Sequence, residues 1–210
     1  MSAGLFRAPE SRPLLQLHQI REGLCRPPRS CDADGSRRAA VAMLLRQQSD
    51  DTEVLFIRRA EHDLDPWSGD LAFPGGRIDP DDPTPRAAAE RETREEIGLT
   101  LMPEQYLGRS DDLTGALLSI HISCFVYQTD ARATFRPNHE VVDLFWVPLR
   151  TLLDPQRNRF HDFHYRGAGR RHPVIDLPEW SDRPLWGITY RLLSNFLERF
   201  DLSFRYPESL

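Results

Sequence analysis

The chain has 210 residues, of which 40% are hydrophobic and 28% are charged. This composition is typical of a globular protein that buries one sizeable hydrophobic core. The formal net charge is −5, so a broad basic surface is not expected, and nucleic acid is not an expected partner. No segment approaches the roughly 18 apolar residues of a membrane helix, so we expect no association with a membrane.

The basic residues and the cysteines exclude several kinds of site. All 27 basic residues are arginines, which excludes a Schiff-base lysine and a phosphate-loop lysine. Cys25, Cys31 and Cys124 form neither a C-x-x-C pair nor a zinc-binding spacing, so we expect reduced thiols. The first residues lack the apolar stretch of a signal peptide. We therefore expect a cytoplasmic protein.

The elements predicted along the chain are strands on both sides of one central helix. Residues 1–36 are predicted to form an N-terminal extension with a short helix over 14–20, and the main domain is expected over 37–205. Strands are expected over 39–45, 54–57, 71–73, 107–113, 117–127 and 143–147. Helices are expected over 85–97, 148–153 and 186–200, and 154–183 is expected to be irregular, with a hairpin as the alternative. This order indicates an α/β domain with a mixed sheet.

The central helix has the clearest signals in the chain. Thr84 is a suitable N-cap, Pro85 suits the first helical position, and Gly98 suits the position just past the end. A stripe of residues at spacings of four is expected to pack this helix against the sheet. The stripe consists of Ala89, Thr93 and Ile97.

Three glutamates of this helix share one arc of its surface. At about 100° per residue, Glu95 lies about 60° to one side of Glu92 and Glu96 about 40° to the other. Like charges at these spacings weaken a helix by roughly 0.2–0.5 kcal/mol per pair, so an offsetting interaction is expected. A hard cation, Mg²⁺ or Mn²⁺, would provide it through oxygen ligands. The alternative is an acidic face that is merely solvated.

Two neighbouring features favour a metal and phosphate site over a solvated face. Gly75 and Gly76 precede the helix and allow backbone to come close to a metal ion or a phosphate. Arg91 lies beside the acidic arc and is expected to pair with Glu95 one turn further on.

Residues 76–99 resemble the signature of the Nudix family. This signature, the Nudix box, reads G-x5-E-x7-R-E-U-x-E-E-x-G-U, where U is a bulky apolar residue. Gly76 opens the box here, and residues 91–99, RETREEIGL, close it. The chain departs from the pattern at two places. Asp82 fills the early acidic position and is followed by one extra residue, and Thr93 replaces the first bulky apolar residue.

The resemblance is nearest to the coenzyme A pyrophosphatase branch of that family. It rests on FPGGRIDPDD over 73–82, on FRPNHEV and FWVPL within 135–149, and on WGIT over 186–189. In all it covers about 39–200. The second arginine of the coenzyme A motif is missing, and the stretch up to Gly69 is one residue longer. The resemblance therefore leaves the choice of substrate open.

The resemblance implies the Nudix fold, an α/β/α sandwich with a mixed sheet. It also implies magnesium-dependent hydrolysis of a diphosphate linkage in a nucleoside diphosphate joined to another moiety, with coenzyme A and its derivatives as candidates. Glu92, Glu95 and Glu96 would bind the metal with backbone from Gly75 or Gly76, and Gly76 would also lie at the substrate. Glu92 is a candidate general base, and Arg91 is placed in the catalytic set.

Three further residues are candidates with an alternative each. Glu140, on a predicted loop, is a second candidate base or ligand, or else a plain surface acid. Arg59 is a candidate diphosphate clamp, or else an ion-pair partner at the surface. Trp67 is expected to stack on a base or an acyl moiety, or else to cap the core. Metal binding by His161, His164 and His172 is not favoured, since H-x-x-H lacks a third spaced ligand.

Other functions remain open beside the main prediction. Within the class, the chain is also compatible with hydrolysis of nucleotide sugars, of dinucleoside polyphosphates, or of unwanted nucleoside triphosphates. Outside it, a non-catalytic nucleotide sensor is the alternative, although the intact acids of the box argue against it. A homodimer is an expectation that rests on family habit alone.

Overall fold

The computed structural model describes residues 14–30, 37–48, 50–62, 68–115, 120–165 and 168–206. Trp67 lies outside these residues, as does Cys31. Among the helices of the described part, none is both long and apolar enough to cross a membrane.

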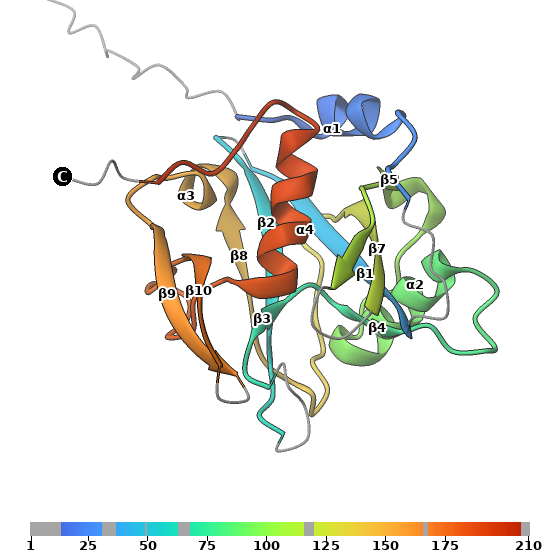
Figure 1. Cartoon of the computed structure of the whole chain (residues 1–210). Coiled ribbons are helices and arrows are strands. Elements are labelled where there is room, and N and C mark those ends of the chain that lie inside the picture. Colours follow the sequence, from blue (N-terminus) through green and yellow to red (C-terminus); the bar gives the residue numbers. More distant parts are fainter. Residues whose placement is uncertain are drawn as a thin grey trace, which may run out of the picture.

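A mixed sheet forms the centre of the molecule (Figure 1). Its main path runs β3–β2–β1–β7–β5, with β4 paired to β1, β6 to β7 and β8 to β2. The β1–β7 pair is parallel, whereas the other pairs are antiparallel. The strands are β1 (Arg37–Gln47), β2 (Thr52–Arg59), β3 (Leu71–Ala72), β4 (Gly75–Arg77), β5 (Tyr106–Arg109), β6 (Leu113–Gly115), β7 (Ile120–Gln128) and β8 (Val141–Pro148).

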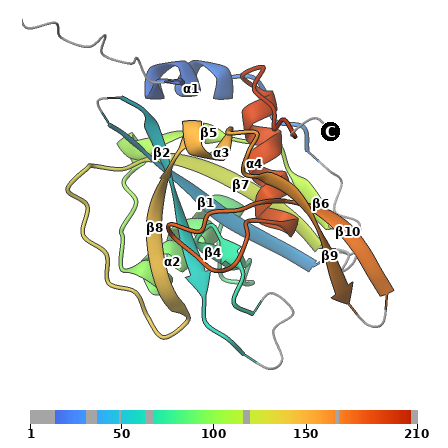
Figure 2. The ribbon, with the colours of Figure 1, turned by 90° about the vertical axis from the view of Figure 1, so that its left-hand side faces the viewer.

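Helices cover both faces of this sheet. Helix α2 (Pro85–Ile97) lies on one face, and α4 (Gly187–Glu198) lies on the other (Figure 2). The short helices are α1 (Leu17–Leu24), α3 (Leu149–Leu152) and the 3₁₀ turn η1 (Pro103–Gln105). The predicted α/β/α sandwich with a mixed sheet is confirmed.

The continuous apolar run of β1 follows from this two-sided packing. Alternate side chains of a strand point to opposite faces, so a strand covered on both sides is apolar throughout. Ala40, Ala42 and Leu44 pack in the cluster beneath α2, while Met43 and Leu45 pack in the cluster on the α4 side.

Helix α2 begins and ends as its sequence predicts. The Thr84 hydroxyl accepts a hydrogen bond from the Ala87 N–H at 3.1 Å, and Pro85 occupies the first turn. Gly98 ends the helix in the left-handed conformation, with φ of 69°, and donates its N–H to the Arg94 carbonyl. The stripe of Ala89, Thr93 and Ile97 is fully buried against the sheet.

The strands around 107–113 and after Pro74 differ from the prediction. The segment expected as one strand over 107–113 is divided between β5 and β6, because the intervening turn buries charged side chains. In this turn Asp112 binds the Arg109 guanidinium at 2.7 Å and lies 3.2 Å from the His121 ring. The chain also continues past Pro74 into β4, which pairs with β1 at Ala39–Val41.

The N-terminal helix starts later than predicted, at Leu17 instead of residue 14. Gln16 precedes the first turn, and its N–H binds the Gln19 side chain at 2.9 Å. Leu15, Ile20 and Leu24 are buried in the main core, so the described part of the N-terminal extension packs onto the domain. The boundary predicted near residue 37 stays a prediction.

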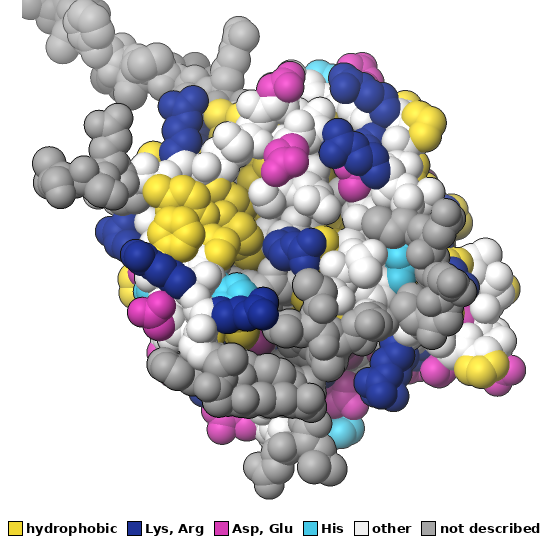
Figure 3. All heavy atoms as spheres, in the orientation of Figure 1, with side chains coloured by type: hydrophobic (Ala, Val, Ile, Leu, Met, Phe, Trp, Pro, Cys, Tyr) yellow, Lys and Arg dark blue, Asp and Glu magenta, His cyan; other side chains and the backbone are white. Residues whose placement is uncertain are grey.

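The hairpin alternative for 154–183 is confirmed. Strands β9 (Asn158–Tyr165) and β10 (Ala168–Ile175) pair in antiparallel register as a separate two-stranded sheet. Phe160 of β9 is 46% exposed and stacks on Tyr206 from the C-terminal segment. Figure 3 shows hydrophobic side chains gathered on this face, with arginines and acidic residues interspersed around them.

Candidate active site

Helix α2 meets the glycine bend of β4 at very close range. The Gly75 N–H donates a hydrogen bond to the Glu96 carboxylate at 2.8 Å. A Cβ on Gly76 would lie 2.5 Å from a Glu92 carboxylate oxygen. A Cβ on Gly75, whose φ is 149°, would lie 2.4 Å from the Ala40 carbonyl. Both glycines are therefore required by the close approach of helix, bend and strand.

The three glutamates of the arc differ in burial. The side chains of Glu96, Glu92 and Glu95 are 3%, 17% and 50% exposed, so two carboxylates are withdrawn from solvent and one is half in water. The sequence correctly placed the three on one side of the helix. It did not predict that Glu95 would be the outer member.

Glu96 is the most perturbed of these acids. Burial raises its pKa to about 7, against an ordinary value of 4.5, and the charges of Glu92 and Glu140 raise the pKa further. The Gly75 N–H and the Arg59 guanidinium, 3.7 Å from the carboxylate, act in the opposite direction without cancelling the effect of burial. Burial also raises the pKa of Glu92. The helix therefore holds carboxylates whose negative charge is incompletely compensated.

Arg91 fastens the outer side of this acidic group. Its guanidinium donates to Glu92 at 3.0 Å, to Glu95 at 3.1 Å and to the Arg77 carbonyl at 3.1 Å. It also binds Asp82 through two hydrogen bonds, of 2.9 and 3.1 Å. The predicted Arg91–Glu95 pair is thus present, as one of several contacts of Arg91.

Asp82 is a site residue whose role the sequence reasoning missed. Hydrogen bonding to Arg91 lowers the pKa of Asp82, and the same bond raises the pKa of Arg91. Asp82 thus pairs with Arg91 from the early acidic position of the box. Its side chain is one methylene shorter than that of a glutamate. The sequence does place Asp82 shortly before the helix that carries Arg91, and this order could have indicated the ion pair.

Glu140 comes to the same site from a distant part of the chain. It lies in a turn, as predicted, and its carbonyl accepts the Ala60 N–H at 2.7 Å. Its charge raises the pKa of both Glu92 and Glu96. Arg59, the neighbour of Ala60, reaches the group from the end of β2. Two residues that the sequence treated as separate candidates therefore meet at one place.

The donor set suits a hard cation. Carboxylate oxygens are the ligands that Mg²⁺ and Mn²⁺ prefer, and a divalent ion would compensate the buried charges of Glu92 and Glu96. Among the described residues, no three acidic, histidine or cysteine side chains already converge on one point. Arg59 and Arg91 bind part of the carboxylate oxygens instead. The residues fit a metal ion once these arginine contacts loosen.

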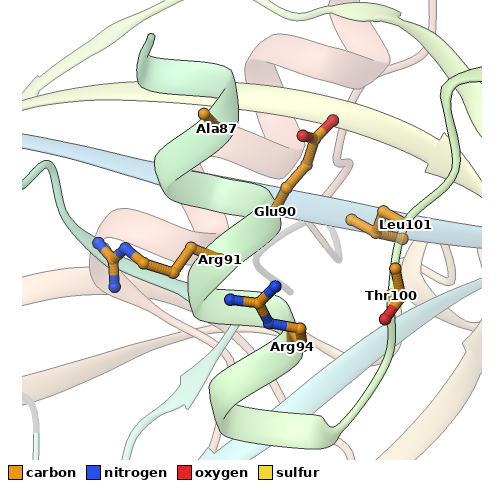
Figure 4. A pocket seen from close by; sticks show the side chains of 6 residues that line it. All are labelled: Ala87, Glu90, Arg91, Arg94, Thr100 and Leu101. Atoms are coloured by element: carbon orange, nitrogen blue, oxygen red, sulfur yellow. The ribbon is translucent and has the colours of Figure 1, made fainter. Parts of the chain in front are cut away.

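A small hollow lies on another flank of α2, apart from the buried carboxylates. It has a volume of about 220 Å³, and Figure 4 shows Glu90 and Arg91 leaving the helix in different directions. Glu90 accepts hydrogen bonds from Arg86 and from the Tyr127 hydroxyl, both at 2.8 Å. This flank therefore attaches the helix to β7 and is distinct from the acidic side.

The remaining candidates lie elsewhere. Trp67, predicted to stack on substrate, is outside the described residues. His161 and His172 face each other across the β9–β10 hairpin, away from the acidic group. Phe196 is buried in the core, whereas Trp186 is partly buried, stacks on Phe163 and donates to Asp70 at 2.9 Å.

Comparison with known proteins shows the family of the chain. Residues 36–166 match the family model described as NUDIX domain. The chain belongs to the Nudix family. This Nudix chain is also similar to "Uncharacterized Nudix hydrolase NudL" of Yersinia pestis (strain Pestoides F), with 30% identity over 168 residues, which cover 80% of this chain and 81% of the relative. The predicted enzyme class, a Nudix-type pyrophosphohydrolase, is confirmed.

Solved structures share the fold of this Nudix chain. A MutT/nudix family protein from Enterococcus faecalis has a TM-score of 0.56 at 13% identity, over 81% of this chain and 64% of that chain. A NUDIX hydrolase from Nitrosomonas europaea has a TM-score of 0.50 at 16% identity, over 82% of this chain and 76% of that chain. At such identities the likeness supports the common fold alone.

The contact between Gly76 and Glu92 can be tested by substitution. In Gly76→Ala the new Cβ displaces the Glu92 carboxylate, which is the far end of a flexible side chain. We expect the hydrolysis rate to fall roughly ten- to a hundredfold, while the free energy of unfolding changes by less than about 1 kcal/mol. Steady-state kinetics and thermal unfolding measure the two effects. A fully active Gly76→Ala enzyme would show that hydrolysis does not need the close contact between Gly76 and Glu92.

The raised pKa of Glu96 makes the stability of the metal-free Nudix chain depend on pH. Because the pKa is about 7 in the folded chain and 4.5 is ordinary, the folded state binds this proton more tightly. The resulting stabilisation is complete below pH 4.5 and is lost as the pH rises through about 7. The melting temperatures of the wild type and of Glu96→Gln would be compared in EDTA. We expect the wild type to gain roughly 5 °C relative to the variant when the pH is lowered from about 8 to about 5. A difference independent of pH would contradict the buried, protonated carboxyl.

Proposed function

We propose that this chain hydrolyses a diphosphate linkage in a nucleoside diphosphate joined to another moiety, and that it depends on Mg²⁺ or Mn²⁺. The single observation that carries the proposal is the close approach of the buried Glu96 and the partly buried Glu92 to the Gly75–Gly76 bend. A phosphate-bearing substrate with a divalent cation would complete the compensation of charge at this place. Coenzyme A and its derivatives are the first candidates for the substrate, because the downstream motifs resemble that branch.

The proposed metal ligands are Glu92, Glu95 and Glu96, with backbone from Gly75. When bound, the cation would neutralise phosphate charge and make a water molecule a better nucleophile. Arg91 keeps Glu92 and Glu95 in place through its hydrogen bonds to both. The Gly75 N–H orients Glu96 in the same way.

Proton transfer and substrate binding fall to the residues around this pair. Glu92 and Glu140 are the candidates for the general base, since Glu92 lies at the glycine bend and burial raises its pKa, and the charge of Glu140 raises that pKa further. Arg59 is the proposed diphosphate clamp, because its guanidinium lies beside Glu96 and binds phosphate oxygens well. Gly76 leaves room for the substrate, and Trp67 is proposed to stack on it.

The alternatives from the sequence are retained in second place. Nucleotide sugars, dinucleoside polyphosphates and nucleoside triphosphates present the same diphosphate group to the same carboxylates. A non-catalytic nucleotide sensor is disfavoured by the retention of all three acids of the box. We also propose that the enzyme acts in the cytoplasm, as expected of a chain in which Cys25 and Cys124 are free thiols. A homodimer stays a prediction.

The proposal predicts a large loss of activity in Glu96→Gln. The amide keeps the shape of the side chain but removes an anionic ligand, so we expect turnover to fall roughly a hundredfold or more. Glu90→Gln is the matched control, since Glu90 lies on the same helix but binds Arg86 and Tyr127. The control should keep nearly full activity, and EDTA should silence the wild type.

The substrate follows from a mass-spectrometric screen of the wild type with Mg²⁺. It would contain coenzyme A, its thioesters, NADH, ADP-ribose and nucleoside triphosphates. Cleavage of coenzyme A would support assignment to the coenzyme A pyrophosphatase branch. Cleavage of another compound in the screen would identify that compound as the substrate instead. Near-normal activity of Glu96→Gln would refute the site, and tight nucleotide binding without any product would favour the sensor.

A further inference from the structure

The segment before Glu140 is bound to the end of the catalytic helix. The last carbonyls of a helix have no partner within it and must be satisfied from outside. Here the Arg136 N–H donates to the Ile97 carbonyl and the Asn138 N–H donates to the Glu96 carbonyl, both at 2.8 Å. The backbone at Asn138 is thus held against the residue whose carboxylate is most deeply buried in the site.

The Asn138 side chain then fixes the turn that follows. Its amide oxygen accepts the Glu140 N–H at 2.8 Å, two residues further along, and its carbonyl accepts the Val141 N–H at 3.3 Å. Such a turn uses a side-chain oxygen in place of a backbone carbonyl, which asparagine does well. The turn thus places Glu140 two residues after the N–H that binds the Glu96 carbonyl, and the charge of Glu140 raises the pKa of both Glu92 and Glu96.

The carbonyl of Glu140 closes the arrangement. It accepts the Ala60 N–H at 2.7 Å, and the preceding residue, Arg59, reaches Glu96. Glu140 is exposed, and the negative charges of Glu92 and Glu96 repel its carboxylate. The hydrogen bonds on both sides of Glu140 therefore act against that repulsion.

We propose that Asn138 is a positioning residue, whose side chain fixes the turn that places Glu140 at the site of Glu92 and Glu96. The inference rests on the proposed function, in which these acids serve metal binding and proton transfer. Asn138 itself contacts neither the reacting atoms nor the metal. Its effect on the reaction passes through Glu140 alone.

A double-mutant cycle of Asn138→Ala and Glu140→Gln tests this dependence. Turnover number, KM and the affinity for Mn²⁺ alone, by calorimetry, would be measured for all four proteins. In the wild-type background we expect Asn138→Ala to lower kcat roughly tenfold, with KM within about twofold. It should also weaken Mn²⁺ binding roughly threefold, because a nearby carboxylate favours the cation with or without direct contact. In the Glu140→Gln background both effects should shrink below about twofold.

Two further variants separate positioning from folding. Asn138→Ser offers a weaker acceptor for the same N–H and should recover part of the activity. Asp130→Ala breaks a similar bond, from the Arg132 N–H to Asp130 at 2.7 Å, in an exposed turn away from the site, and should leave kcat unchanged.

The outcomes distinguish this inference from the proposed function. Equal losses of kcat in both backgrounds, or no loss in the wild-type background, would overturn the role of Asn138. If the wild type is active, the hydrolase proposal is unaffected by either result. A wild type that cleaves none of the substrates would contradict the proposed function instead. In that case the Mn²⁺ affinities of the four proteins still decide whether Asn138 acts through Glu140.

Discussion

The contact between helix α2 and the Gly75–Gly76 bend is the constraint on which the site depends. The Glu96 carboxylate is buried because the bend comes close enough for the Gly75 N–H to bind it. A side chain at Gly75 would push the bend away from β1, and a side chain at Gly76 would displace the Glu92 carboxylate. Burial of that carboxylate raises its pKa, and the raised pKa is the sign of a charge that needs a further partner.

Two arginines compensate part of the charge of the acids. Arg59 lies beside Glu96 on the inner side, and Arg91 spans Glu92, Glu95 and Asp82 on the outer side. Each arginine offsets part of the repulsion that three like charges on one helix create. A divalent cation would replace the inner contact more readily than the outer one, because Arg91 is anchored by Asp82 at two points. The pairing thus gives the site a rigid outer side and an adaptable inner side.

The sequence predicted those parts of the site that are local. The caps of α2, the buried stripe and the Arg91–Glu95 pair all follow from helical spacing, and each was found. The strand β4 was missed, because Pro74-Gly75-Gly76 indicates an end of structure when nothing shows that β1 lies beside it. The sheet likewise decides that Arg59 and Glu140 meet Glu96. No periodicity in one segment reports contacts between residues so far apart in the chain.

The family relationship establishes the class of enzyme, and the motifs over 73–82, 135–149 and 186–189 are the basis for proposing coenzyme A as the first candidate substrate. The described residues show where charge is concentrated and how it is held. The site therefore has a definite centre at the glycine bend.

The central claim is that the carboxylates of Glu92 and Glu96 form a cation site at the glycine bend. Anomalous diffraction from crystals soaked in Mn²⁺ tests it most directly, because the metal is located without reference to activity. The account predicts one anomalous peak between these two carboxylates, beside Gly75 and Gly76. A peak elsewhere, with both glutamates still bound as they are to Arg59, Arg91 and the Gly75 N–H, would contradict it.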